Sequence, residues 1–133
     1  MTESAVFKRK GDFVSAVANY TLALEFNPNY ADAYNNLASL WSTCPDENFR
    51  DGPKALEYAN KACELSKWAN CLHLFTLGGA YAEVGQFDQA VHWAKKSLEL
   101  APKQQPGRVD ELRRKLQCFE QRNPWRDESA VKT

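Results

Sequence analysis

Two cysteines and one histidine come closest to a reactive or metal-binding motif. Cys71 and His73 are separated by a single residue, and Cys63 precedes both of them. Structural zinc sites use four ligands in closely spaced pairs, whereas residues i and i+2 on a helix point to different faces. Because the ligand set is incomplete, we expect ordinary helix positions here, with no metal and no cofactor.

Nucleophilic catalysis would need a base beside a Cys or Ser and donors for an oxyanion. The chain holds two histidines, His73 and His92, and both fall in helical patterns without a strand-to-helix elbow or a glycine-rich loop. The acidic residues are scattered over polar helix faces. We predict that the protein is not an enzyme; the alternative is an enzyme that uses Cys71 and His73.

The composition argues against nucleic acid as a partner and against a membrane. Lys plus Arg and Asp plus Glu number 17 each in 133 residues, so the formal net charge is zero. A neutral chain has no general attraction for anionic surfaces. One basic cluster alternates with acidic residues, as on a solvated helix face. Its cations are Arg108, Arg113, Arg114 and Lys115.

Cysteine usage and the absence of targeting signals favour a cytoplasmic protein. The four cysteines form no CxxC pair, which favours reduced thiols. The first residues do not show the basic and apolar regions of a signal peptide. No apolar run approaches the roughly 20 residues that a membrane span requires.

The elements that position these residues are predicted to be helices, and part of the pattern occurs twice. Residues 11–28 read "GDFVSAVANYTLALEFNP", and residues 85–102 read "GQFDQAVHWAKKSLELAP". Apolar side chains in both follow the i, i+3, i+4, i+7 spacing of one helix face. In each copy a glycine turn precedes the helix, and a Pro follows its end.

Further helical stripes lie between these two copies. One stripe contains Tyr34, Leu37, Ala38 and Trp41, and another contains Leu74, Leu77, Gly78 and Tyr81. Their small residues, Ala38 and Gly78, would let a paired helix approach closely. A weaker middle copy of the second helix contains Ala55, Ala59, Ala62 and Leu65. A final amphipathic helix carries Val109, Leu112, Leu116 and Phe119 on one face.

These residues resemble the tetratricopeptide repeat (TPR) family, whose repeating unit is a pair of helices called A and B. Helix A carries an aromatic residue, a Leu, a small residue and a Tyr. Helix B carries an Ala, an aromatic residue, a second Ala and a Pro. The matching residues are Tyr34, Leu37, Ala38 and Trp41 in the middle unit, Leu77, Gly78, Tyr81, Ala90 and Pro102 in the third, and Phe7, Ala16, Tyr20, Ala23 and Pro28 in the first. The stretch "TCPDENFRDGPKALEYANKACELSKW" is similar to a bacterial TPR subtype that often lies near the C-terminus of larger signalling or multi-repeat proteins.

The resemblance implies an all-α, right-handed TPR-like solenoid of about three helical hairpins plus a C-terminal capping helix. We expect one domain over residues 1–122, with units at 2–28, 31–66 and 70–102, a capping helix at 106–121, and a loose or disordered polar tail at 123–133. In the middle unit, 14 positions separate Trp41 from Ala55, whereas nine separate Tyr81 from Ala90. Extra residues therefore enter the loop between its helices, and Asp51 or Gly52 is the expected cap of the following helix.

In TPR arrays the A helices line a concave groove where partners bind. Here that face would carry Asp32, Asn35, Asn36, Ser39, Thr43, Leu72, Phe75, Thr76, Gly79 and Glu83. Asn36 can donate to and accept from a peptide backbone, and Phe75 is the expected exposed apolar anchor. The alternatives are that Asn36 bonds between helices and that Trp68 covers Phe75. Asn36 falls at one position of carboxylate-clamp TPRs, but Met1, Ala5, Leu72 and Thr76 occupy the places where that clamp needs Lys, Asn, Lys and Arg, so a carboxylate clamp is not expected.

The sequence therefore predicts a non-enzymatic scaffold for protein–protein interaction that binds a peptide or an amphipathic helix in this groove. One alternative is self-assembly of copies through the N-terminal edge around Val6 and Phe7, where no cap precedes the first helix. Another is that the chain is a fragment of a larger multi-repeat signalling protein.

Overall fold

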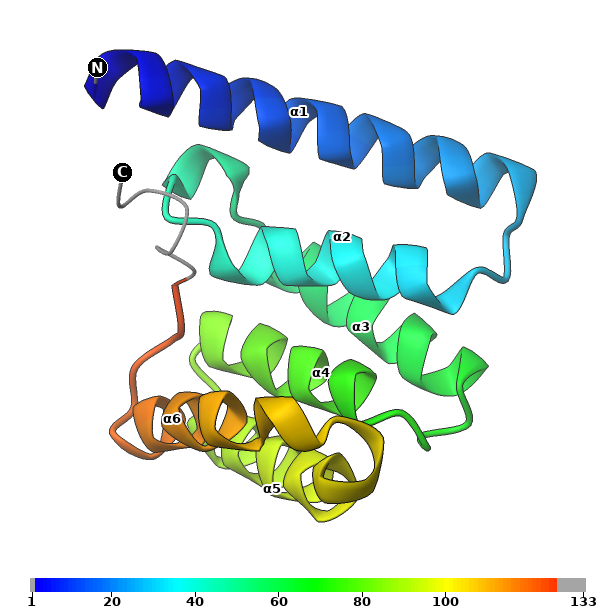
Figure 1. The fold of residues 1–133 in the computed structure, drawn as a ribbon, viewed down its shortest axis with the longest axis vertical. Helices are drawn as coiled ribbons and strands as arrows, with labels where there is room; N and C mark the ends of the chain where they lie inside the picture. Colours follow the sequence, from blue (N-terminus) through cyan, green and yellow to red (C-terminus); the bar gives the residue numbers. More distant parts are fainter. Residues whose placement is uncertain (1, 127–133) are drawn as a thin grey trace.

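The structure, a computed structural model, describes the backbone of residues 2–126 and the side chains of residues 12–126. Over this part of the chain the fold is all-α, as predicted, and the helices stack in layers (Figure 1). The helices are α1 (Thr2–Phe26), α2 (Ala31–Thr43), α3 (Gly52–Leu65), α4 (Cys71–Glu83), α5 (Phe87–Gln104) and α6 (Val109–Glu120), with short 3-10 turns η1 (Glu47–Phe49) and η2 (Pro106–Arg108). None of these helices combines the length and the apolar character needed to cross a membrane.

The predicted small and large stripe residues form the packing between successive helices. Leu37 and Ala38 of α2, and Leu77 of α4, are fully buried. Gly78 lies where α5 crosses α4: a Cβ built there would lie 2.9 Å from the carbonyl oxygen of Ala90. A larger side chain would therefore push the two helices apart, because packed interiors leave little free space. The close crossing of α4 and α5 depends on this glycine.

The turn predicted at Gly11 and Asp12 is wrong. α1 runs without a break from Thr2 to Phe26, so the first unit is a single long helix instead of a hairpin. Glycine in a helix interior costs about 1 kcal/mol relative to alanine, which a helix of this length tolerates. At the corresponding place in the third unit, Gly85 adopts φ 82° directly after α4 and allows the chain to turn back. The side chains of Val6 and Phe7, expected at the N-terminal edge, lie outside the described residues.

The long loop of the middle unit is ordered by backbone and side-chain bonds. The carboxylate of Asp46 accepts from the amide of Asn48 at the start of η1. Asp51 is the N-cap of α3, and its carboxylate accepts from the amide of Lys54 at 3.1 Å. Of the two residues predicted as this cap, Asp51 is the one that the structure confirms. Its own amide donates to the carbonyl of Trp41 at 2.9 Å. The extra residues therefore return the chain to the end of α2 in a fixed position.

The last helix covers an apolar surface of the array. Leu112 and Phe119 of α6 are buried among side chains of α4 and α5, and Figure 1 shows α6 lying against both helices. α5 itself runs two residues beyond Pro102, where the sequence predicted its end. A Pro inside a helix removes one N–H donor and its ring crowds the carbonyl four residues earlier, so the last turn of α5 includes Pro102 at some cost.

Candidate partner-binding groove

A polar chamber lies between α2, α4 and α6. It has a volume of about 250 Å³ and is lined by Asn35, Asn36, Ser39, Leu72, Phe75, Thr76, Arg108, Leu112 and Lys115. We call it the proximal chamber, because it lies toward the N-terminal halves of α2 and α4. Its floor comes from the two predicted A helices, and its wall comes from α6.

A smaller cavity of about 40 Å³ continues toward the C-terminal ends of α2 and α4. This distal pocket is lined by Ser39, Ser42, Thr43, Phe75, Thr76, Gly79, Lys115, Phe119 and Trp125. It shares Ser39, Phe75, Thr76 and Lys115 with the proximal chamber. The two cavities therefore adjoin one another along α2 and α4, and we call the pair the groove.

The structure brings together all the predicted groove residues except Asp32 and Glu83, which line neither cavity. In the proximal chamber, the side-chain oxygen of Asn35 is buried and has no hydrogen-bond partner among the described residues. The side chain of Asn36 forms no hydrogen bond with another described side chain, but the side chains of residues 1–11 lie outside the described part of the chain, so the alternative of an Asn36 bond between neighbouring A helices stays a prediction. Two amide side chains thus leave hydrogen-bonding capacity unused in the chamber. Their role in binding stays a prediction.

Phe75 is not an exposed anchor. Only 6% of the residue is exposed, and its ring lies 5.8 Å, centroid to centroid, from the ring of Phe119. The capping helix, and not Trp68, provides this cover: Trp68 stacks on Trp93 with centroids 5.3 Å apart. The predicted exposure failed because the sequence does not indicate which helices α6 lies against.

Asp32 lies at the start of α2, where it anchors the ring of His73. The two ring nitrogens of His73 lie 2.9 Å from a carboxylate oxygen of Asp32 and 3.0 Å from Oγ of Ser66. The imidazole is almost fully buried and joins α2, the end of α3 and α4. In this arrangement His73 ties the three helices together, and Oγ of Ser66 also donates to the carbonyl of Ala62 at 3.0 Å.

Cys63 and Cys71, the two cysteines of the candidate motif, show no sign of activation. Burial and the nearby Glu64 carboxylate raise the pKa of the Cys63 thiol to about 12, and burial raises the pKa of Cys71 as well. A thiol with a raised pKa is protonated near neutral pH and is a poor nucleophile and ligand. Among the described residues, no group of His, Cys, Asp and Glu is arranged to hold a metal ion.

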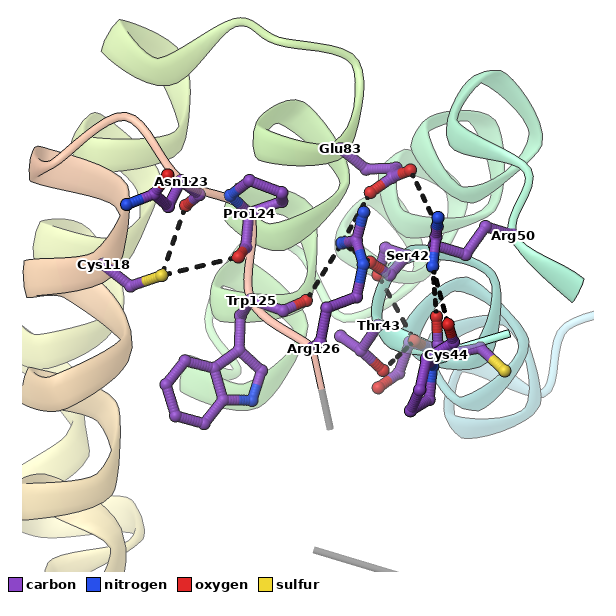
Figure 2. A network of polar contacts seen from close by, with 12 residues as sticks. Ser42, Thr43, Cys44, Arg50, Glu83, Cys118, Asn123, Pro124, Trp125 and Arg126 are labelled. Carbon is purple, nitrogen blue, oxygen red and sulfur yellow. Dashed lines mark hydrogen bonds and ion pairs between the residues drawn. The ribbon is translucent and has the colours of Figure 1, made fainter. Parts of the chain in front are cut away.

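Glu83 ends α4 and binds two arginines. Nε of Arg50, from the long loop, lies 3.5 Å from one of its carboxylate oxygens, and Nη1 of Arg126 lies 2.7 Å from the other. Figure 2 shows the two guanidinium groups reaching Glu83 from opposite sides. Only 14% of the Glu83 side chain is exposed. The predicted groove residue is therefore already paired.

Sequence reasoning missed the contribution of the C-terminal part of the chain to the groove. Arg108 of η2 and Leu112 and Lys115 of α6 line the proximal chamber, and Trp125 lines the distal pocket. The prediction of a loose tail is wrong for residues 123–126. In addition to its contact with Glu83, Arg126 donates to the carbonyl of Ser42 at 3.4 Å. A signal was present, because Trp125 is the one large apolar residue in an otherwise polar tail.

Comparisons with known protein families match two parts of the chain to helical repeats. Residues 6–40, covering most of α1 and much of α2, match the family described as TPR repeat, and residues 74–104, covering α4 and α5, match the family described as tetratricopeptide repeat. α3 and the long loop before it fall in neither match. No curated protein matches the chain. The two matches and the all-α helical stack together support a tetratricopeptide repeat protein.

Proposed function

We propose that the protein is an interaction scaffold that binds an extended segment of a partner protein in the groove between α2, α4 and α6. TPR repeats generally mediate protein–protein interaction and are typically not enzymes. A bacterial origin and a cytoplasmic location remain predictions from the sequence.

The observation that carries this proposal is the unused hydrogen-bonding capacity of Asn35 and Asn36 in the proximal chamber. Asn36 is only partly buried, so its amide can both donate to and accept from a ligand in the chamber. An extended peptide backbone offers donors and acceptors at regular intervals, which suits a row of amide and hydroxyl side chains. Ser39 and Thr76 continue that row toward the distal pocket.

The distribution of charge along the groove also favours a partner segment that is acidic at one end and basic at the other. Arg108 and Lys115 bring cations into the proximal chamber, although Arg108 is partly neutralised by Glu111 at 2.9 Å. Glu83 stands beyond the distal end. An extended ligand with an acidic group over the chamber and a basic group near Glu83 would match both ends.

The test is a capture experiment with a variant that blocks only the proximal chamber. Asn36→Arg adds a long cation to the chamber, and Gln89→Arg adds the same side chain at an exposed position of α5 outside the groove. We expect proteins captured from a lysate by the wild type and by Gln89→Arg to be lost with Asn36→Arg, while helical circular dichroism is unchanged. Equal capture by all three would refute groove binding.

Self-assembly has one observation in its favour. The described part of α1 exposes Val14, Leu22 and Phe26, the last at 84%. Their spacing of four or eight positions places them along one side of the helix. Association of copies through this face predicts a molar mass that rises with protein concentration and returns to the monomer value in Phe26→Glu. A constant monomer mass in the wild type would refute it.

A further inference from the structure

The distal end of the groove has the electrostatic character of a cation site. α2 ends at Thr43 and α4 ends at Glu83, and neither helix has a basic residue in its last turn. The C-terminal end of a helix carries a partial negative charge of about half an electron. Two such ends and the nearly buried carboxylate of Glu83 therefore face the same small region, which favours a positive group.

Arg50 prepares this site without filling it. Its Nη1 donates to the carbonyls of Cys44 and Pro45 at 2.9 and 3.1 Å, which holds the guanidinium against the long loop. From there Nε reaches only one oxygen of Glu83. The carboxylate is thus held in place with its second oxygen directed to the region beside Ser42 (Figure 2). A second guanidinium can bind there at little ordering cost.

The chain places its own residues 123–126 on this site, and we call this segment the strap. Arg126 contacts the second oxygen of Glu83 and the Ser42 carbonyl. The neighbouring Trp125 lines the distal pocket, with Nζ of Lys115 at 5.5 Å from its ring centroid. A cation at this distance is attracted by the face of an aromatic ring. The seated pair therefore shows which chemistry the distal site accepts: an aromatic side chain followed by an arginine.

The strap is held by few contacts. Apart from the contacts of Trp125 and Arg126, the hydrogen bonds of the strap within the described part of the chain are one from the amide of Asn123 to the carbonyl of Cys118 at 3.0 Å and two weak ones from Sγ of Cys118 to the carbonyls of Asn123 and Pro124, each at 3.4 Å. None of residues 123–126 lines the proximal chamber. A partner segment that repeats the aromatic and arginine contacts and continues into the chamber would add bonds to Asn35 and Asn36 that the strap does not make.

We infer that the distal pocket is a recognition site for an aromatic–arginine pair in a partner protein, and that the partner binds by displacing the strap. This inference rests on the proposed groove function and specifies the partner's chemistry. The strap competes as a tethered ligand, whose effective concentration is typically millimolar for a short flexible link. An external segment lacks this advantage, so its contacts in the proximal chamber must supply the binding free energy that the tether provides to the strap.

The experiment uses the full chain and a peptide that copies the strap, Arg-Asn-Pro-Trp-Arg. In the release variant, Trp125→Ala with Arg126→Ala, the site is vacated without shortening the chain. NMR titration of the backbone amides of Thr43 and Gly79 reports on the distal pocket. We expect the peptide to bind the release variant at least about tenfold more tightly than the wild type, because the tethered competitor has been removed. A peptide with Ala in place of Trp and of the second Arg should not bind.

A third protein separates specific recognition from nonspecific association. Adding Glu83→Gln to the release variant removes the charge that the arginine contacts, and we expect peptide affinity to fall by about tenfold or more, in line with loss of an ion pair to a largely buried carboxylate. Equal peptide binding by wild type and release variant, or equal binding of the alanine peptide, would overturn the inference. Asn36→Arg tests the proximal chamber independently. If capture of partner proteins is lost with Asn36→Arg but the peptide does not bind the release variant, the distal recognition site is refuted while groove binding stands.

Discussion

Two adjacent glycines of α4 allow one substitution to be tested against its own control. Gly78 and Gly79 both lie inside the helix, so alanine should gain the same helix propensity at either position, about 0.8–1.0 kcal/mol. The surroundings differ. A Cβ at Gly79 would lie 3.9 Å from Oγ of Ser42, which is an ordinary contact. A Cβ at Gly78 would lie 2.9 Å from the carbonyl oxygen and 3.4 Å from the amide nitrogen of two α5 residues.

The two free energies of unfolding should therefore change in opposite directions. Gly79→Ala should stabilise the protein by about 1 kcal/mol. At Gly78 the obstructing atoms belong to the backbone, which cannot rotate away, and overpacking of this kind costs about 1–3 kcal/mol. After the propensity gain is subtracted, Gly78→Ala should destabilise the protein by up to about 2 kcal/mol. The difference between the variants should equal the overpacking cost, since the propensity gain cancels.

Urea unfolding followed by fluorescence of the four tryptophans measures both variants against the wild type. The slope of the free energy with urea concentration should stay constant, because neither change alters the surface exposed on unfolding by much. If Gly78→Ala is as stable as Gly79→Ala, the close approach of α4 and α5 is not as described. If Gly79→Ala is destabilised to the same extent as Gly78→Ala, the argument from local space is refuted.

Three further substitutions test the core, a buried bond and a buried thiol. Phe119→Ala should lower the free energy of unfolding by about 3–5 kcal/mol through loss of burial and creation of a cavity, as measured by urea unfolding; a change below 1 kcal/mol would mean that α6 does not cover the array. Ser97→Ala removes a fully buried donor to the Cys71 carbonyl at 2.6 Å and should cost about 1 kcal/mol, whereas Ser15→Ala, on the exposed side of α1, should change stability by less than about 0.5 kcal/mol. The pKa of Cys63 is raised from 9.0 to about 12 on folding, so the unfolded thiol ionises first as pH rises, and stability should fall between pH 9 and 12 by up to about 1.4 kcal/mol per unit; Cys63→Ala should remove that part of the slope, and an unchanged slope would show that the thiol is not buried on folding.

The helices could be predicted from the sequence because their apolar spacing is local. Leu37 with Ala38, and Leu77 with Gly78, lie on the buried faces expected from the 3.6-residue period. The turn at Gly11 could not be settled in the same way. Glycine permits both a turn and a helix, and only the helices available for packing decide between them.

The groove was harder to predict because it depends on residues far apart in the chain. The floor from α2 and α4 follows from the repeat, whereas the wall depends on where α6 lies. Glu83 looked like a groove residue, but Arg126 is 43 positions away and no spacing rule connects them. The prediction that Phe75 is exposed was wrong for the same reason, because Phe119, which covers it, comes from a helix outside the repeat pattern.

The bond from Arg126 to Ser42 joins residues 84 positions apart, and this has a consequence for the order of folding. Helical hairpins form early, because their contacts are close in sequence. The strap can dock only after α2, α4 and α6 have come together, so we expect its contacts to form last. In the folded protein they should also open first, below the free energy of global unfolding. Hydrogen exchange at the amides of Asn123, Trp125 and Arg126 should therefore be faster than in α4, with no loss of the surrounding helices.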